Sequence, residues 1–145
     1  MKVQPPKEVR ERILTKLNEK PDLREVLSSK HLAALGDSYL NLLYSVSLSS
    51  KLGRPAGDKI RGSILCTALR DSGLRRLLPK RVDRHRQADA LEALAAYTWI
   101  KGSISFQSAV KILNRYEDPT AGMTNLALKM GEVFEKHQKR KNVSP

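Results

Sequence analysis

Two carboxylates lie three residues apart in the stretch RQADALEALAAYTWIKG, residues 86–102. The stretch contains no proline and no internal glycine, and strong helix formers dominate it, so it predicts a helix over residues 87–101. A helix places positions i and i+3 on one face, which makes Asp89 and Glu92 neighbours. Because like charges on a half-buried face repel each other and lose solvation, the pair needs compensation, which a bound cation would supply.

The ordinary alternative for this pair is an acidic spot that faces solvent or pairs with a nearby arginine. An exposed amphipathic helix usually carries charged residues along one whole side. Here only Asp89 and Glu92 precede Lys101 in the predicted helix, and the many alanines would let other elements approach closely. This stretch alone leaves both interpretations open.

A third acid lies in HLAALGDSYLNLLYSV, residues 31–46, where Asp37 is the only charged residue between His31 and Lys51. The preceding Gly36 falls in the middle of a predicted helix, where glycine costs about 1 kcal/mol relative to alanine. Such a glycine makes sense if another helix crosses closely at that point. A crossing helix rich in alanine, carrying Asp89 and Glu92, would fit, and three carboxylates could then converge on one cation.

Three stretches of the chain resemble motifs of the ribonuclease III family, and the two sharpest of them follow each other in the family order. LAALGDSYLNL resembles the family signature, in which an apolar pair precedes Leu-Gly-Asp, a small residue and an apolar helix. ADALEALAAY resembles the second motif, and KIRGSILCTALRDSGL between them is similar to the family's helix that ends in a Gly-Leu turn. The resemblance covers roughly residues 20–115.

This resemblance implies an all-α endonuclease domain that forms a homodimer and processes double-stranded or structured RNA with Mg²⁺, or Mn²⁺ in its place. The products would carry 5′-phosphate and 3′-hydroxyl ends. By motif match, Asp37, Asp89 and Glu92 stand at the family's metal-binding carboxylates and are the expected catalytic and metal-binding residues. Mg²⁺ also suits the bare chemistry, because it prefers carboxylate and water oxygens and activates water for attack on a phosphodiester.

The sequence departs from the family pattern at two points. Ala33 stands where the signature has a glutamate, and Lys30 replaces a further upstream acid. No segment is long enough for a separate double-stranded-RNA-binding domain, which makes the chain similar to the minimal, archaeal-type enzymes of the family. Two alternatives stay open: a catalytically weak or inactive RNA-binding protein on the same fold, and an unrelated helical protein that matches by chance.

The charge of the chain is strongly positive and unevenly placed. The formal net charge is +12, and residues 51–86 hold eleven basic residues against three acidic ones. Such a block favours a polyanionic partner such as nucleic acid. The alternative is a surface rich in both signs, which the excess of one sign disfavours. The basic residues that bracket the acidic helix are the candidate RNA contacts: Lys59, Arg61, Arg84 and Arg86.

The elements that must position these side chains are all predicted to be helical. We expect a single ribonuclease III-like domain of about seven helices over residues 1–145, with a basic tail at 136–145. The predicted helices cover residues 5–20, 21–29, 31–52, 58–73, 87–101, 105–119 and 123–141, with a short helical turn and a basic loop between residues 74 and 86. The contact surfaces of the homodimer are expected on helix 31–52 and on the alanine-rich helix.

The remaining composition excludes several classes of protein. One cysteine, Cys66, rules out an internal disulfide framework, and it is expected to be a buried small residue. The three histidines are scattered, which disfavours zinc. Because no signal peptide or membrane-spanning run is recognisable, we expect a soluble, cytoplasmic protein.

Overall fold

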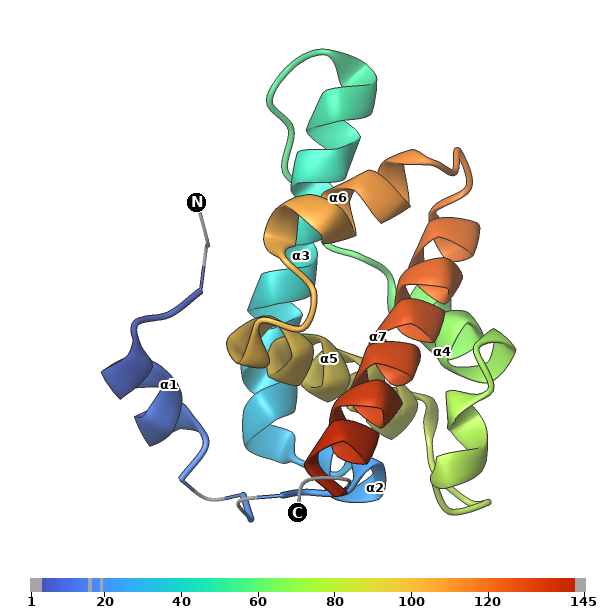
Figure 1. The fold of residues 1–145 in the computed structure, drawn as a ribbon. Helices are drawn as coiled ribbons and strands as arrows, with labels where there is room; N and C mark the ends of the chain where they lie inside the picture. Colours follow the sequence, from blue (N-terminus) through green and yellow to red (C-terminus); the bar gives the residue numbers. More distant parts are fainter. Residues whose placement is uncertain (1–3, 16, 19, 143–145) are drawn as a thin grey trace.

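All regular elements of the described residues are helices. The computed structural model describes residues 4–15, 17–18 and 20–142, with side chains described up to residue 139. The helices are α1 Lys7–Ile13, α2 Leu23–Leu27, α3 Lys30–Leu52, α4 Gly62–Asp71, α5 Arg84–Lys101, α6 Phe106–Asn114 and α7 Pro119–Asn142, with a 3₁₀ turn η1 at Leu74–Leu77 (Figure 1). The predicted all-α class is therefore confirmed.

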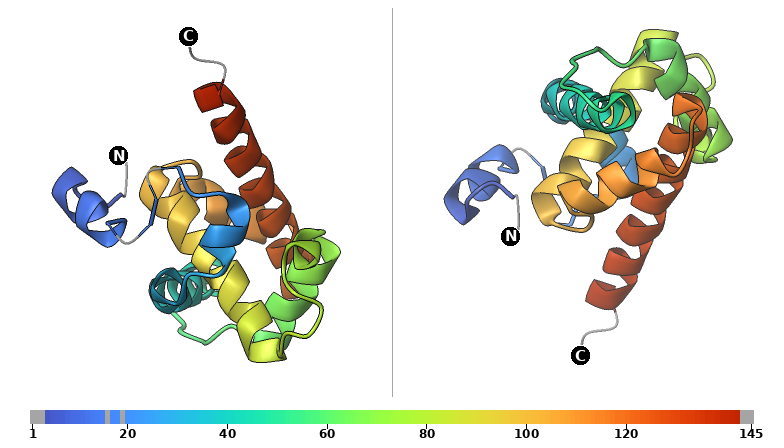
Figure 2. Two further views of the ribbon diagram at one scale, coloured as in Figure 1. Left: turned by 90° about the horizontal axis from the view of Figure 1, so that it is seen from below. Right: turned by 90° about the horizontal axis from the view of Figure 1, so that it is seen from above.

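Helix α5 is the central element of the fold. It contacts α2, α3, α4 and α7, which surround it in all three views (Figures 1 and 2). Its alanines and leucines are buried almost without exception, and small alanine side chains allow the neighbouring helices to come close. Most side chains of this helix are thus buried inside the protomer and leave little surface for a partner copy, so its predicted role in a homodimer stays a prediction.

The closest of these approaches is the crossing of α3 over α5 at Gly36. A Cβ atom added to Gly36 would lie 1.8 Å from the backbone carbonyl oxygen of Glu92 and 2.4 Å from its carbonyl carbon. No side chain fits there without moving backbone. The expected reason for a mid-helix glycine, a close crossing by the helix that carries Glu92, is confirmed.

Local capping defines both ends of the central helix. The Asp83 side chain accepts a hydrogen bond from the Arg86 amide at 2.8 Å, and Gly102 ends the helix with φ of 73°. The helix thus begins at Arg84, three residues before its predicted start, so part of the predicted basic loop is helical.

Other predicted boundaries also differ from the structure. Helix α1, predicted over residues 5–20, covers only Lys7–Ile13, and α2 covers Leu23–Leu27 instead of residues 21–29. Asp58 does not cap α4, which begins four residues later, at Gly62. Pro119 does not end the preceding helix but opens α7, where its missing amide hydrogen costs nothing. Helix α7 then continues to Asn142, so residues 136–142 of the predicted basic tail are helical, while residues 143–145 lie outside the described residues.

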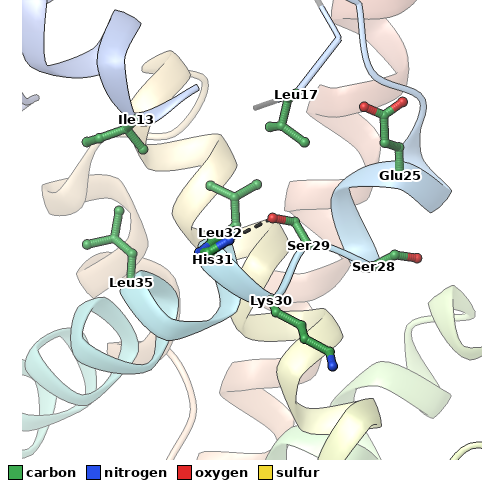
Figure 3. Close-up of a pocket in the computed structure, with 9 residues that line it drawn as sticks. All are labelled: Ile13, Leu17, Glu25, Ser28, Ser29, Lys30, His31, Leu32 and Leu35. Carbon is green, nitrogen blue, oxygen red and sulfur yellow. Dashed lines mark hydrogen bonds between the residues drawn. The ribbon is translucent and has the colours of Figure 1, made fainter. Parts of the chain in front are cut away.

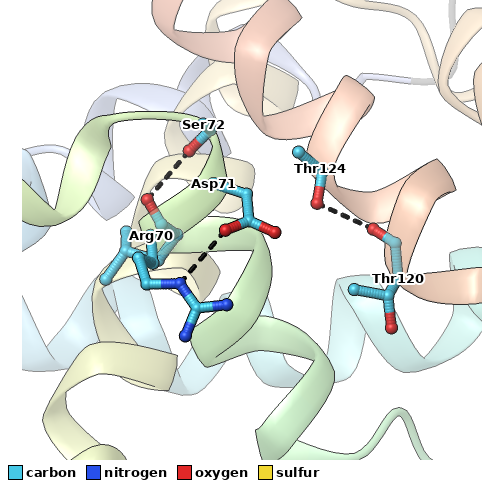
Figure 4. Close-up of polar contacts among 6 residues, drawn as sticks. Arg70, Asp71, Ser72, Thr120 and Thr124 are labelled. Atoms are coloured by element: carbon cyan, nitrogen blue, oxygen red, sulfur yellow. Dashed lines mark hydrogen bonds and ion pairs between the residues drawn. The ribbon is translucent and has the colours of Figure 1, made fainter.

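Helices α4 and α7 contact each other through faces whose buried residues are apolar, and several polar side chains near this contact bond within their own helix. Arg70 Nε donates to the carboxylate of Asp71 at 3.1 Å, and the Thr124 hydroxyl donates to the Thr120 carbonyl within α7 at 2.8 Å (Figure 4). Cys66 lies in the buried face of α4, as expected, and its thiol donates to the Arg84 carbonyl. Apolar burial therefore holds this side of the fold.

Apolar side chains remain exposed on α1 and α3. Helix α1 lies to one side of the other helices (Figures 1 and 2) and has no buried residue. On α3, Leu42 is 57 % exposed and Val46 is also exposed, although both belong to the apolar periodicity of that helix. They face away from α5 and α6, which cover the other side of α3. None of the described helices has the length and apolarity needed to cross a membrane.

Replacement of Gly36 by alanine should destabilise the protein by about 1–3 kcal/mol, because overpacking against backbone outweighs the better helix propensity of alanine. Chemical denaturation of both proteins measures the difference. The matched control is Gly62→Ala at the start of α4, where an added Cβ meets no atom within 4 Å. A Gly36→Ala protein as stable as the Gly62→Ala control would contradict the close crossing.

Candidate active site

The candidate carboxylates meet in one open cavity of about 490 Å³ between α3, α5 and the segment before α4. Asp37 comes from α3, one residue after the close crossing, and Asp89 and Glu92 come from α5. The other lining residues are Lys30, Ala33, Ala34, Lys59, Ile60, Gly62, Leu65, His85 and Ala88. The structure thus brings together the carboxylates that the sequence places in two separate motifs.

Glu92 is the most deeply placed of the three carboxylates. Its residue is only 6 % exposed, and it is the only charged residue in the buried part of the described chain. Burial, a side-chain hydrogen bond with Asp37 and the negative charges of Asp37 and Asp89 raise its pKa to about 8, against a weaker opposing effect of Lys59. Without a bound cation, burial and the neighbouring carboxylates therefore favour the protonated form of Glu92.

Asp37 is oriented by a neighbour on its own helix. The side-chain amide of Asn41 donates to Asp37 Oδ1 at 3.2 Å, and the Asn41 carbonyl oxygen accepts from the backbone amide of Ile60 at 3.0 Å. The Asp37 carboxylate is thus linked through one side chain to the backbone of the segment that precedes α4.

Asp89 lies at the edge of the cavity, one turn of α5 from His85. The distance from Asp89 Oδ2 to His85 Nε2 is 3.8 Å, and the His85 side chain is largely exposed. Among the ion pairs of the described residues, none includes Glu92, and Asp89 pairs only with this histidine. The alternative of a solvent-facing or arginine-paired acidic spot therefore does not describe Glu92.

These groups suit a hard divalent cation bound partly through water. In the described part of the chain, no three His, Cys, Asp or Glu side chains stand together as a ready-made metal cluster. Mg²⁺ does not require one, since it keeps several waters and usually binds through one or two carboxylates. The contact between Asp37 and Glu92, which repel each other once both are ionised, provides such a pair. Two carboxylates in contact within an open cavity fit the ion.

The candidate RNA-binding residues occupy different positions around this cavity, and all of them are exposed. Lys59 lines the carboxylate cavity, and Arg86 lines a smaller adjoining cavity together with Asp89. Arg61 precedes α4, and Arg84 is the first residue of α5, and neither lines these two cavities. The structure therefore brings Lys59 and Arg86 nearest to the carboxylates.

Sequence reasoning missed Asn41 and assigned no role to Lys30 or His85. The position of Asn41, one helical turn after Asp37, is a local signal that could have identified it, because residues four apart share a helix face. The contact of Asn41 with Ile60 has no such local signal. Lys30 lines both the carboxylate cavity and the adjoining one, which only the packing of α3 beside α5 reveals.

A larger cavity of about 580 Å³ lies elsewhere, between α1 and the junction of α2 with α3. Leucine and isoleucine side chains dominate its lining, and the single acid, Glu25, is bonded to Asn18 (Figure 3). The Lys30 side chain extends away from Ile13 and Leu35 in this view. This cavity lacks a carboxylate pair, so we place the candidate site in the smaller one.

The chain also matches the model of a known protein family. The family model described as Ribonuclease III matches residues 30–137, a span that contains all three carboxylates and both helices that carry them. No curated protein matches the chain.

The metal-free protein should lose stability as the pH rises from about 5 to 8. Glu92 has a folded-state pKa of about 8 against an ordinary value of 4.5, so the folded protein binds the extra proton in this window. The stabilisation that this proton provides is complete below the ordinary pKa and is lost as the pH rises through the folded-state pKa. The free energy of unfolding then falls by up to about 1.4 kcal/mol per pH unit. Denaturation in chelator at several pH values measures this slope.

Glu92→Gln should flatten this pH dependence. Glu132→Gln serves as the matched control, since that carboxylate is exposed, pairs with Lys136 and has a lowered pKa. If Glu92→Gln kept the wild-type slope, the raised pKa of Glu92 would be disproved.

Proposed function

This chain belongs to the ribonuclease III family, and on that premise we propose that it is an Mg²⁺-dependent endoribonuclease. Its substrate would be double-stranded or structured RNA, cut to 5′-phosphate and 3′-hydroxyl ends. The observation that carries the proposal is the contact of Asp37 with the buried Glu92 in an open cavity. A buried acid that lies against a second acid and forms no ion pair destabilises a protein, so a bound cation would explain its presence.

The proposed roles follow from position in the cavity. Asp37 and Glu92 would hold the ion, and Asp89 at the edge of the cavity would hold it directly or through water. A bound Mg²⁺ would activate water for attack and stabilise the charge that develops on the phosphate. Lys59 lines the cavity, and its positive charge acts to lower the pKa of Glu92, so it is the best-placed residue to contact the phosphate.

An RNA-binding protein without catalytic activity is the second candidate, and one observation favours it. Ala33, the position of the missing family glutamate, lines the carboxylate cavity and leaves its wall apolar there. Lys30 lines the same cavity, so the local charge is less negative than a site for two metals needs. Retention of all three other carboxylates supports the enzyme over this alternative.

We also propose that the protein acts as a homodimer through α3. The face that carries Leu42 and Val46 is apolar and exposed, and α3 has no charged residue between Asp37 and Lys51. An uncharged, apolar helix face suits a self-complementary contact around a two-fold axis. Two copies joined in this way would present two carboxylate cavities to the strands of one duplex.

Glu92→Gln should reduce cleavage of long double-stranded RNA by at least about a hundredfold, because the metal supplies several kcal/mol of transition-state stabilisation. Binding of the duplex should survive, and the melting temperature in chelator should not fall. Gel assays with and without Mg²⁺, together with a binding assay, measure both effects. A variant that melts earlier yet cuts normally would show that the carboxylate is structural.

Affinity for duplex RNA should fall steeply with salt, because basic side chains release counterions from the phosphates. Replacing Arg84 and Arg86 with alanine should lower the slope of log K against log salt by about one for each phosphate that the variant no longer binds. Titrations at several salt concentrations give the slope. An unchanged slope would place the RNA-binding residues on another part of the surface.

Leu42→Glu should convert the dimer into a monomer, since a charge would be buried at the centre of the proposed contact. Light scattering at micromolar concentration measures the mass. The control is Leu128→Glu on α7, a leucine that is similarly exposed, at 47 %, but lies on another helix. A wild-type protein that is monomeric under these conditions would rule the dimer out.

A further inference from the structure

Polar side chains along one face of α3 bind the backbone of the segment 56–60. These side chains belong to Asn41, Ser45 and Ser49, which are spaced by four residues and therefore share a helix face. Their partners are alternate residues of the segment, which runs antiparallel to α3. We call this arrangement the polar ladder.

The hydrogen bonds of the polar ladder are short and regular. Ser49 Oγ lies 2.9 Å from both the amide nitrogen and the carbonyl oxygen of Ala56. Ser45 Oγ lies 2.9 Å from the same two atoms of Asp58. The third pairing joins Asn41 Oδ1 to the amide nitrogen of Ile60 at 3.0 Å.

The spacing follows from backbone geometry. Four residues of an α-helix rise about 6 Å, and two residues of extended chain rise about 6.6 Å. Side chains on successive turns of α3 therefore meet every second residue of an extended segment. This match lets a strand-like segment satisfy its backbone groups against a helix, without a partner strand.

The last pairing of the ladder differs from the other two, because it reaches the candidate active site. Asn41 accepts from the Ile60 amide and also donates to Asp37 Oδ1 at 3.2 Å. With its carbonyl oxygen committed to Ile60, the amide nitrogen of Asn41 has to face Asp37. Lys59, next to Ile60, lines the same cavity as Asp37.

We propose that Asn41 is a positioning residue, whose side-chain amide holds the Asp37 carboxylate and the segment carrying Lys59 in fixed register around the cavity. The inference rests on the proposed function and deepens it. Asn41 does not touch the substrate. It orients one candidate metal ligand and, through the Ile60 amide, one candidate phosphate contact. Residues that hydrogen-bond metal ligands in this way typically contribute a factor of about 10–100 to affinity or activity.

The experiment measures Mn²⁺ binding to the intact protein, without RNA, by calorimetry. Asn41→Leu keeps the number and branching of the side-chain heavy atoms and removes both hydrogen bonds, and the smaller Asn41→Ser removes the amide with less risk to folding. Both variants should bind Mn²⁺ at least about tenfold more weakly than the wild type. Hydrogen exchange of the Ile60 amide should be faster in Asn41→Leu, which checks the backbone contact directly.

Ser45→Ala is the matched control, because it removes a neighbouring pairing of the polar ladder that does not reach Asp37. Its Mn²⁺ affinity should stay within about twofold of the wild type, whereas a structural role shared by the whole ladder would weaken both variants equally. In cleavage assays, Asn41→Leu should lower kcat, while Ser45→Ala should mainly raise KM through a less ordered Lys59.

The outcomes separate this inference from the proposed activity. Wild-type protein that binds Mn²⁺ but leaves duplex RNA intact would reject the activity, while weaker Mn²⁺ binding by the Asn41 variants would still support the positioning role. Folded Asn41→Leu and Asn41→Ser proteins with wild-type Mn²⁺ affinity would overturn the inference. A wild-type protein without measurable Mn²⁺ binding would overturn it as well.

Discussion

The close crossing of α3 and α5 at Gly36 is the contact on which the rest of the structure depends. The carbonyl group of Glu92 fills the space where a side chain of residue 36 would stand. Asp37 is the next residue of α3, so the same crossing brings the carboxyl groups of Asp37 and Glu92 close to each other. Fully buried leucines of both helices, including Leu40, Leu43, Leu91 and Leu94, stabilise a crossing that the acids alone would oppose.

The electrostatics of the cavity follow from this geometry. Burial and the charges of Asp37 and Asp89 raise the pKa of Glu92 when no cation is bound, and a divalent ion would offset both effects. The surrounding surface has the opposite sign, with Lys30 and Lys59 on the cavity wall and a net charge of +12 on the chain. A negative centre inside a positive surface suits a polyanionic substrate that must meet a metal.

The three faces of helix α3 meet three different surroundings: helix α5, the extended segment before α4, and solvent. One face, with Gly36 and its leucines, packs on α5, and the face with Asn41, Ser45 and Ser49 binds the extended segment before α4. The third face, with Leu42 and Val46, is exposed and apolar. The weak amphipathicity of this helix in the sequence has its explanation here, since its exposed side, from Ala34 to Ser50, carries small and apolar residues and no charged ones.

The sequence by itself determined the all-α class, the three acids and the need for a close helix at Gly36, because helical periodicity, glycine cost and motif spacing are local properties. Only the tertiary structure decided which basic residues reach the acids: Lys59 does, and Arg61, two positions later, does not. It also decided that α5 is internal and that Asn41 binds the Ile60 amide 19 residues away. These outcomes depend on how helices pack and on where an extended segment finds hydrogen-bond partners, and neither is encoded in the spacing of residues within one helix.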